Sequence, residues 1–161
     1  NTAVEMEEKG YNFYTESAEK TDNKFSQQVL ESLAEQELKH KNKFQELAEG
    51  NDVTTEDMDS KDIEKQIKGF FEEGSDTEKE EWKDEETDVY EKALEFEKKT
   101  YNLYKEMAEE VDTDQEKEFL QALMEEESKH EESLHNILYY MTDHTWWLAD
   151  TESETWNWMN I

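Results

Sequence analysis

A short motif that occurs twice constrains the fold of this chain more than any other feature. Glu37-Leu38-Lys39-His40 and Glu127-Ser128-Lys129-His130 each place a carboxylate and an imidazole three residues apart. On an α-helix this spacing puts both side chains on one face, across a single turn. The motifs lie 127 − 37 = 90 residues apart, and the same shift aligns further pairs without a gap, among them Ala3 with Ala93, Glu7 with Glu97, Tyr14 with Tyr104, Ala18 with Ala108, Leu30 with Leu120 and Leu33 with Leu123. Two helical hairpins in one register predict an all-α, four-helix bundle with an internal pseudo-two-fold repeat.

The residues that usually interrupt helices are scarce. The chain has no Pro and only 4 Gly among its 161 residues, which favours long helices. Apolar residues at helical spacing predict helices over about 2–20, 24–48, 87–111 and 115–140, all within a single domain, 1–161. The turns Thr21-Asp22-Asn23 and Asp112-Thr113-Asp114 supply N-cap residues within each hairpin.

The least regular segments are the middle and the end of the chain. Residues 51–86 are expected to form a long crossover between the hairpins, which would connect opposite ends of the bundle. Two interpretations of it stand side by side: a flexible acidic linker, or a short helix that Ser60 caps and that ends near Gly74, with Ile63, Ile67, Phe70 and Phe71 along it. The tail, 141–161, is too aromatic for a free tail, and we expect it to pack on the bundle or on another subunit; its tryptophans are Trp146, Trp147, Trp156 and Trp158.

The net charge narrows the classes of partner. With 46 acidic against 17 basic residues, the formal net charge is −29, so the surface should repel nucleic acids and anionic membranes. We therefore expect no nucleic-acid partner and no membrane partner. No run of 18 apolar residues predicts a transmembrane helix, and we expect a cytoplasmic protein. The absence of Cys excludes disulfides, Cys-ligated zinc and iron–sulfur clusters within this chain.

The repeat also selects carboxylates on the other two helices. Glu7 and Glu97 share narrow helical stripes with small and aromatic residues: Ala3, Gly10, Tyr14 and Ala18 on one helix, and Ala93, Thr100, Tyr104 and Ala108 on the other. A buried carboxylate without a partner costs several kcal/mol. With the two Glu-x-x-His pairs, four carboxylates and two imidazoles point inward. Two divalent cations would balance those four negative charges.

The donor types indicate which metals would bind. Carboxylate and imidazole ligands without thiolate suit Fe, Mn, Co or Zn. Bridging carboxylates can hold two ions about 3.5–4 Å apart, and carboxylate-bridged bundles use one Glu from each of two helices plus a Glu-x-x-His from each of the others. On that pattern Glu37 and Glu127 bridge the ions, and the terminal ligands are Glu7, His40, Glu97 and His130. Tyr14 and Tyr104 are placed to hydrogen-bond these carboxylates and orient them.

Two stretches, Ala3–Tyr14 and Leu33–His40, with their counterparts around Glu97 and Glu127, resemble the rubrerythrin branch of the ferritin-like superfamily. The resemblance covers all four main helices and implies a ferritin-like bundle. It implies a cofactor of two Fe ions, replaceable by Mn or Zn in the isolated protein, that cycle between Fe(II) and Fe(III). Such proteins react with peroxide or dioxygen as peroxidases or ferroxidases in oxidative-stress defence. They are commonly dimers, and we expect a homodimer.

Two departures from the family pattern bear on function. Full-length rubrerythrins carry a Cys-rich rubredoxin module, and this chain has no Cys, so electrons are expected from a separate donor. Rubrerythrins often carry an extra Glu one turn beyond the third-helix ligand, where this chain has Thr100; the first helix has Gly10 at the corresponding place. This difference favours a ferroxidase-like site over peroxide reduction by a mobile ligand. The alternatives are an iron-storage or encapsulated ferritin-like protein, and a non-enzymatic metal-binding helical module.

Overall fold

The computed structural model describes residues 2–51 and 84–142, together with the single positions 53, 63, 65, 67 and 69. Its helices are α1 (Thr2–Lys20), α2 (Lys24–Ala48), α4 (Asp84–Glu110) and α5 (Asp114–Thr142). Over the described ranges there are four such helices and no strands, which confirms the prediction of an all-α protein consistent with a ferritin-like four-helix bundle.

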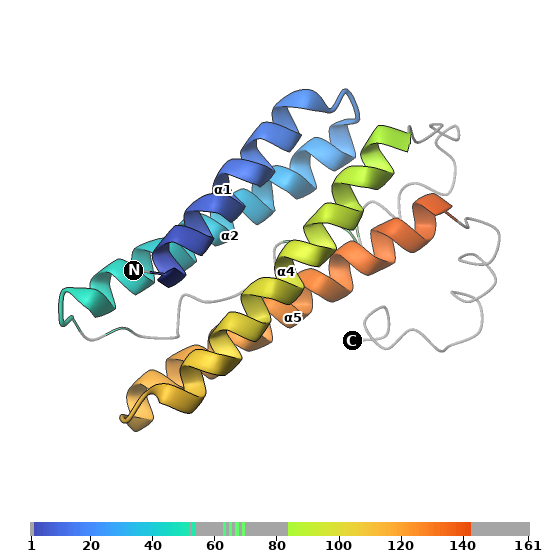
Figure 1. Ribbon diagram of the computed structural model, residues 1–161. Coiled ribbons are helices and arrows are strands. Elements are labelled where there is room, and N and C mark those ends of the chain that lie inside the picture. The colour runs from blue at the N-terminus through green and yellow to red at the C-terminus, as the bar shows by residue number, and fades with distance from the viewer. Residues whose placement is uncertain are drawn as a thin grey trace.

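The helices pair as two hairpins (Figure 1). α1 packs along α2, α4 packs along α5, and α1 contacts α4 between the hairpins. α2 ends at the lower left of the view, whereas α4 begins at the upper right. Most of the crossover predicted for this interval lies outside the described residues. Within it, positions 63, 65, 67 and 69 are helical, and Ile63 and Ile67 are buried.

Local hydrogen bonds fix where α2 begins and ends. Asn23 is its N-cap, and the side-chain oxygen of Asn23 accepts a hydrogen bond of 2.9 Å from the backbone N–H of Ser26. At the other end Gly50 has a φ of +80°, the left-handed conformation that glycine adopts without strain. The backbone N–H groups of Gly50 and Asn51 donate to the carbonyls of Leu47 and Glu46, which completes a Schellman motif.

The second hairpin is capped in a similar way but begins earlier than predicted. The hydroxyl of Thr113 accepts a hydrogen bond from the backbone N–H of Glu116 and donates one to its carboxylate, so this pair caps α5. α4 begins at Asp84 rather than near residue 87, so the prediction of crossover structure as far as residue 86 was wrong there. Glu86, in its first turn, accepts a 2.7 Å hydrogen bond from Thr21 in the turn between α1 and α2. That contact joins the hairpins and cannot be read from the local pattern.

The apolar core consists of two clusters with a polar layer between them. The larger cluster includes Leu30, Leu33, Tyr90, Leu134 and Ile137, and the smaller includes Phe44, Tyr104, Phe119 and Leu123. Along every helix, the buried Glu and His residues fall between the members of one cluster and those of the other. The folded chain therefore encloses its polar residues between two apolar ends that exclude water.

Two further expectations concern segments or properties beyond the bundle. The Trp-rich tail over 141–161 lies outside the described residues from position 143 onward. No helix in the described part of the chain is both long enough and apolar enough to cross a membrane.

Candidate metal centre

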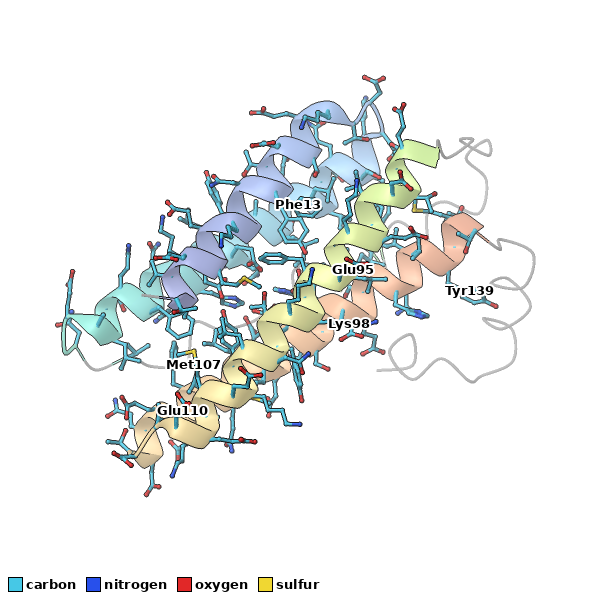
Figure 2. The ribbon with its side chains drawn as sticks, viewed as in Figure 1. Phe13, Glu95, Lys98, Met107, Glu110 and Tyr139 are labelled. Atoms are coloured by element: carbon cyan, nitrogen blue, oxygen red, sulfur yellow. The ribbon has the colours of Figure 1, made fainter. Side chains whose placement is uncertain are left out.

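The six predicted metal ligands are brought together in the polar layer. Each is exposed by 1% or less, and all four helices contribute: Glu7 from α1, Glu37 and His40 from α2, Glu97 from α4, and Glu127 and His130 from α5. Glu95 and Lys98, which flank Glu97 in sequence, are exposed on the outside of α4 (Figure 2). Helical spacing thus separates the inward carboxylate from its charged neighbours.

One group of ligand atoms gathers around His40. Its Nδ1 lies 3.1 Å from Oε1 of Glu127 and 3.6 Å from Oε2 of Glu7. Together with Glu37, these residues offer ligand atoms that all lie within 4.8 Å of one another. Four donors at this spacing could hold one metal ion.

A second group gathers around His130. Its Nδ1 lies 3.5 Å from Oε2 of Glu97 and 3.6 Å from Oε2 of Glu127, and Glu37 completes the group. Glu37 and Glu127 therefore belong to both groups, and Glu127 turns one oxygen toward each histidine. The two imidazoles stack with ring centroids 5.9 Å apart. This arrangement suits two ion positions that share two carboxylates.

The interior ligand atoms have no other partners that would explain their burial. Both oxygens of Glu7, Glu37 and Glu127 are buried and make no hydrogen bond within the described part of the chain, and the same holds for Nδ1 of each histidine. Buried polar atoms are normally hydrogen-bonded, because leaving them unpaired costs free energy. Oxygen and imidazole donors left free in this way fit two ions of the Fe, Mn, Co or Zn type.

Proton affinities reflect the same excess of negative charge. Burial raises the pKa of Glu37 well above its usual value, and the charges of Glu7 and Glu127 add to this effect. Burial and the charge of Glu127 raise the pKa of Glu97 to about 8. Burial alone would lower the pKa of His130, but the carboxylates of Glu127 and Glu97 outweigh it and raise that pKa to about 9. Without metal, protons must therefore neutralise part of this core.

Two neighbours on α1 position the carboxylates. The buried hydroxyl of Tyr14 donates a hydrogen bond to Oε1 of Glu97. Gly10 lets α1 approach closely, because a Cβ there would overlap Oε2 of Glu37 and lie 2.7 Å from a ring carbon of Phe96. The ring of Phe13, which is labelled in Figure 2, stacks on that of Phe96 with centroids 6.4 Å apart, so this contact joins the hairpins.

The residues of α4 that correspond to Tyr14 and Gly10 in the sequence repeat are Tyr104 and Thr100, and their contacts are different. Tyr104 is fully buried, yet its hydroxyl has no hydrogen-bond partner within the described residues, unlike that of Tyr14. The hydroxyl of Thr100 is also buried and donates to the backbone carbonyl of Phe96, one turn earlier on the same helix. The prediction that Tyr104, like Tyr14, hydrogen-bonds a ligand carboxylate is therefore wrong for the described residues, because the way in which the hairpins pack leaves the hydroxyl of Tyr104 without an acceptor.

One buried carboxylate in this region escaped the sequence analysis. Glu126 is 2% exposed, and its Oε2 lies 3.3 Å from Nε2 of His40. Helical spacing does predict an inward position for this residue, because residue 126 lies three positions after Leu123 and four before His130. The neighbouring Glu127 filled the motif, and Glu126 was passed over.

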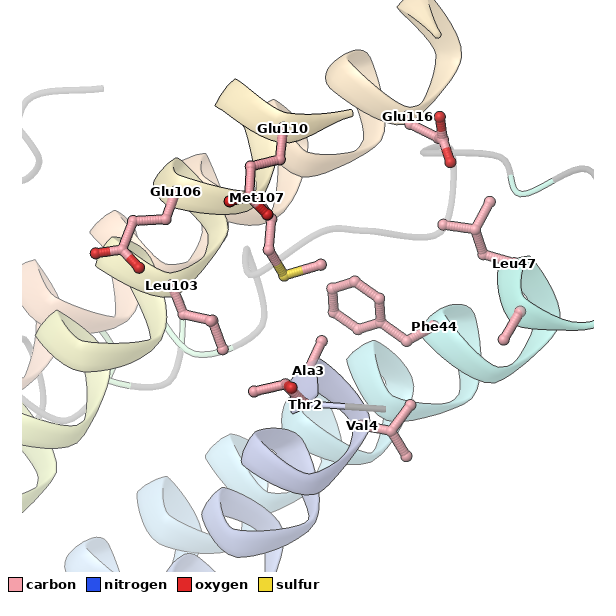
Figure 3. Close-up of a pocket in the computed structure, with 11 residues that line it drawn as sticks. Thr2, Ala3, Val4, Phe44, Leu47, Leu103, Glu106, Met107, Glu110 and Glu116 are labelled. Carbon is pink, nitrogen blue, oxygen red and sulfur yellow. The ribbon is translucent and has the colours of Figure 1, made fainter. Parts of the chain in front are cut away.

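A pocket of about 460 Å³ opens between the hairpins at the end of the bundle nearest the start of α1. Phe44 and Met107 face each other across it from α2 and α4 (Figure 3). Phe44 and Ala3, which also lines the pocket, each lie one helical turn from a ligand, His40 and Glu7 respectively. The pocket therefore ends close to the first group of ligand atoms.

Helices arranged in this way, with carboxylate and imidazole groups enclosed between them, define a class of helical-bundle proteins whose interior could hold metal. A family model described as Rubrerythrin matches residues 1–138, and the chain belongs to this family. Neither the curated proteins nor the solved structures gave a match to the chain.

Proposed function

We propose that this protein is a di-iron oxidoreductase that reacts with peroxide or dioxygen, of the peroxidase or ferroxidase type. The observation that carries the proposal is the sharing of Glu37 and Glu127 between two groups of buried ligand atoms. Membership of the rubrerythrin family supports iron as the metal. Bound iron would supply electrons to the oxidant by cycling between Fe(II) and Fe(III).

Each ligand has a distinct role in this proposal. Glu37 and Glu127, which belong to both groups, would help to hold both ions. Glu7 and His40 complete one position, and Glu97 and His130 complete the other, in keeping with the two groups of atoms. Tyr14 holds Glu97 in orientation through its hydrogen bond, while apolar clusters flank the ligands on both sides.

Partners follow from the same proposal. The 161 residues contain no Cys that could hold an iron–sulfur electron carrier, and we propose that a carrier outside them reduces the centre. We also propose a homodimer in the cytoplasm, a chain crossover between the hairpins with an internal two-fold relation, and a Trp-rich tail that covers the bundle or a second subunit. The oxidant that reacts with the iron centre is peroxide or dioxygen.

Thr100 favours the ferroxidase type over the peroxidase type, and with it a second candidate function, iron storage. Its hydroxyl is committed to the carbonyl of Phe96, and Gly10 has no side chain, so neither position adds a carboxylate to the six. A site with fixed ligands oxidises Fe(II) without the ligand exchange that an additional Glu would permit. Storage would further require a large assembly or encapsulation by another protein.

Stopped-flow absorbance of the anaerobic Fe(II)-loaded protein, mixed separately with peroxide and with dioxygen, tests the proposal. We expect rapid oxidation that is lost in Glu97→Ala and retained in Glu95→Ala, since Glu95 is exposed on the same helix. Slow oxidation in the native protein with both oxidants would leave only a non-enzymatic metal-binding module. A faster reaction with dioxygen than with peroxide would favour the ferroxidase, and light scattering would show whether a storage shell assembles.

A further inference from the structure

The two histidines of the centre differ in what their Nε2 atoms contact. His40 turns Nδ1 toward the ligand atoms, where Oε1 of Glu127 is 3.1 Å away. Its other nitrogen, Nε2, lies 3.3 Å from Oε2 of Glu126, at hydrogen-bonding distance. The side chain of Glu126 is only 3% exposed, so water does not screen this contact. His40 thus stands between the metal ligands and a second, outer carboxylate.

His130 lacks an equivalent partner. Its Nδ1 faces Oε2 of Glu97 at 3.5 Å, but its Nε2 is buried and makes no hydrogen bond within the described ranges 2–51 and 84–142. The residue related to Glu126 by the sequence repeat is number 126 − 90 = 36, and it is Gln36, a neutral amide that is 3% exposed. The difference between the two halves is therefore one carboxylate against one amide at matching buried positions.

An outer carboxylate changes how a histidine binds metal. When it accepts a hydrogen bond from the Nε2–H group, it fixes the tautomer in which the lone pair of Nδ1 is free to bind metal. It also holds the ring in place and makes the imidazole more basic. Loss of such a partner typically lowers metal affinity by about 10–100-fold. The amide of Gln36 carries no net charge, so it does not supply a carboxylate at the position that matches Glu126.

We infer that Glu126 is a positioning residue for His40 and that it makes the two metal positions unequal, so that the His40 position fills first and more tightly. This inference rests on the proposed di-metal centre and extends it to the order of loading. Glu37 and Glu127 serve both positions, so the difference arises from the terminal ligands and their surroundings.

Calorimetric titration of the metal-free full chain with Zn(II), which has no redox chemistry, tests the inference apart from catalysis. The native chain should bind two ions in resolved steps. Glu126→Gln should weaken the tighter step by about 10–100-fold and bring the steps together. Gln36→Glu should tighten the weaker step, and Glu125→Gln, an exposed neighbour on α5, should change neither. Circular dichroism would check that each variant is folded, and Gln36→Glu remains decisive if Glu126→Gln does not fold.

The double variant Glu126→Gln/Gln36→Glu separates positioning from general destabilisation. With one equivalent of Co(II), paramagnetically shifted imidazole NMR signals should come from His40 in the native chain and from His130 in the double variant. Two equal zinc affinities in the native chain, or an unchanged order of loading in the double variant, would overturn the inference while leaving the proposed function intact. Failure of the native chain to bind any zinc would instead contradict the di-metal centre itself.

Discussion

The hydroxyl of Tyr14 on α1 donates a hydrogen bond to Oε1 of Glu97 on α4, so a side chain of one hairpin orients a metal-ligand candidate of the other. Burial, followed by the negative charges of Glu97 and Glu37, raises the pKa of Tyr14 well above its usual value. Tyr14 therefore stays protonated and keeps its donor across the physiological pH range.

Tyr14→Phe should destabilise the protein, whereas Tyr104→Phe should not. The first change leaves a buried carboxylate oxygen without its donor, which should lower the free energy of unfolding by about 1.5–3 kcal/mol. The second removes a buried hydroxyl that has no partner within the described residues. Urea denaturation of both variants would measure the difference in the free energy of unfolding. Equal decreases in the two variants would show that the hydrogen bond of Tyr14 does not stabilise the protein.

Gly10→Ala should distort the centre. The added Cβ would overlap Glu37 Oε2 and crowd Phe96, so we expect a loss of about 1–3 kcal/mol in stability and weaker zinc binding. Gly69→Ala is a matched control, because position 69 is helical and a Cβ there meets nothing within 4 Å. That control should be neutral or slightly stabilising, and a Gly10→Ala protein with native zinc affinity would contradict the close approach of α1 to Glu37.

Removal of a shared carboxylate should cost both ions, and removal of an unshared one should cost a single ion. Glu37→Ala or Glu127→Ala should abolish stoichiometric binding of two metals, since both residues belong to both ligand groups. Glu7→Ala should retain one ion, and Glu5→Ala, exposed on the same helix, should retain two. Elemental analysis after gel filtration gives the counts. Two ions retained in Glu37→Ala or Glu127→Ala would refute the bridging assignment.

The metal-free protein should become less stable as the pH rises from 4.5 to about 9. The folded-state pKa of Glu97 is raised from 4.5 to about 8, so the folded chain holds a proton that the unfolded chain has lost, and this contribution disappears as the pH rises through that window. The pKa of His130, raised from 6.5 to about 9, acts in the same direction. Glu127 has a lowered pKa, and its contribution is lost only in acid.

Melting temperatures measured as a function of pH, after chelation and after zinc loading, would check the predicted decline in stability. Zinc should remove or reverse the decline, because the ligands bind metal in their deprotonated forms. Glu97→Gln should flatten the profile of the metal-free protein. A metal-free profile that stays flat or rises with pH over this range would contradict the raised pKa values of Glu97 and His130.

The sequence predicted the parts of this site that depend on helical spacing. Glu7 and Glu97 were found because a helix carries a residue inward every three or four positions, and the repeat supplied their register. The structure places both in the polar layer with the two Glu-x-x-His pairs. Spacing along one helix was enough because each helix keeps a single inward face.

Contacts between hairpins were not predictable in the same way. The first turn of α4 contains Glu86, which accepts a hydrogen bond from Thr21 of the other hairpin. The contrast between Tyr14 and Tyr104 likewise depends on how the hairpins pack. Glu126 lies on the inward stripe, but only the position of His40 on another helix shows what it contacts. Such pairings join residues that are 65 to 86 positions apart, beyond the reach of any local pattern.

The buried carboxylate oxygens that lack protein donors also bear on how long each molecule survives in a cell. A chain without ions depends on protons to neutralise its interior and spends a larger fraction of its time unfolded, where proteases cleave it. Ions that bind only the native form shift that balance by mass action. The abundance of the protein should therefore follow the supply of metal through degradation alone, without any separate sensor.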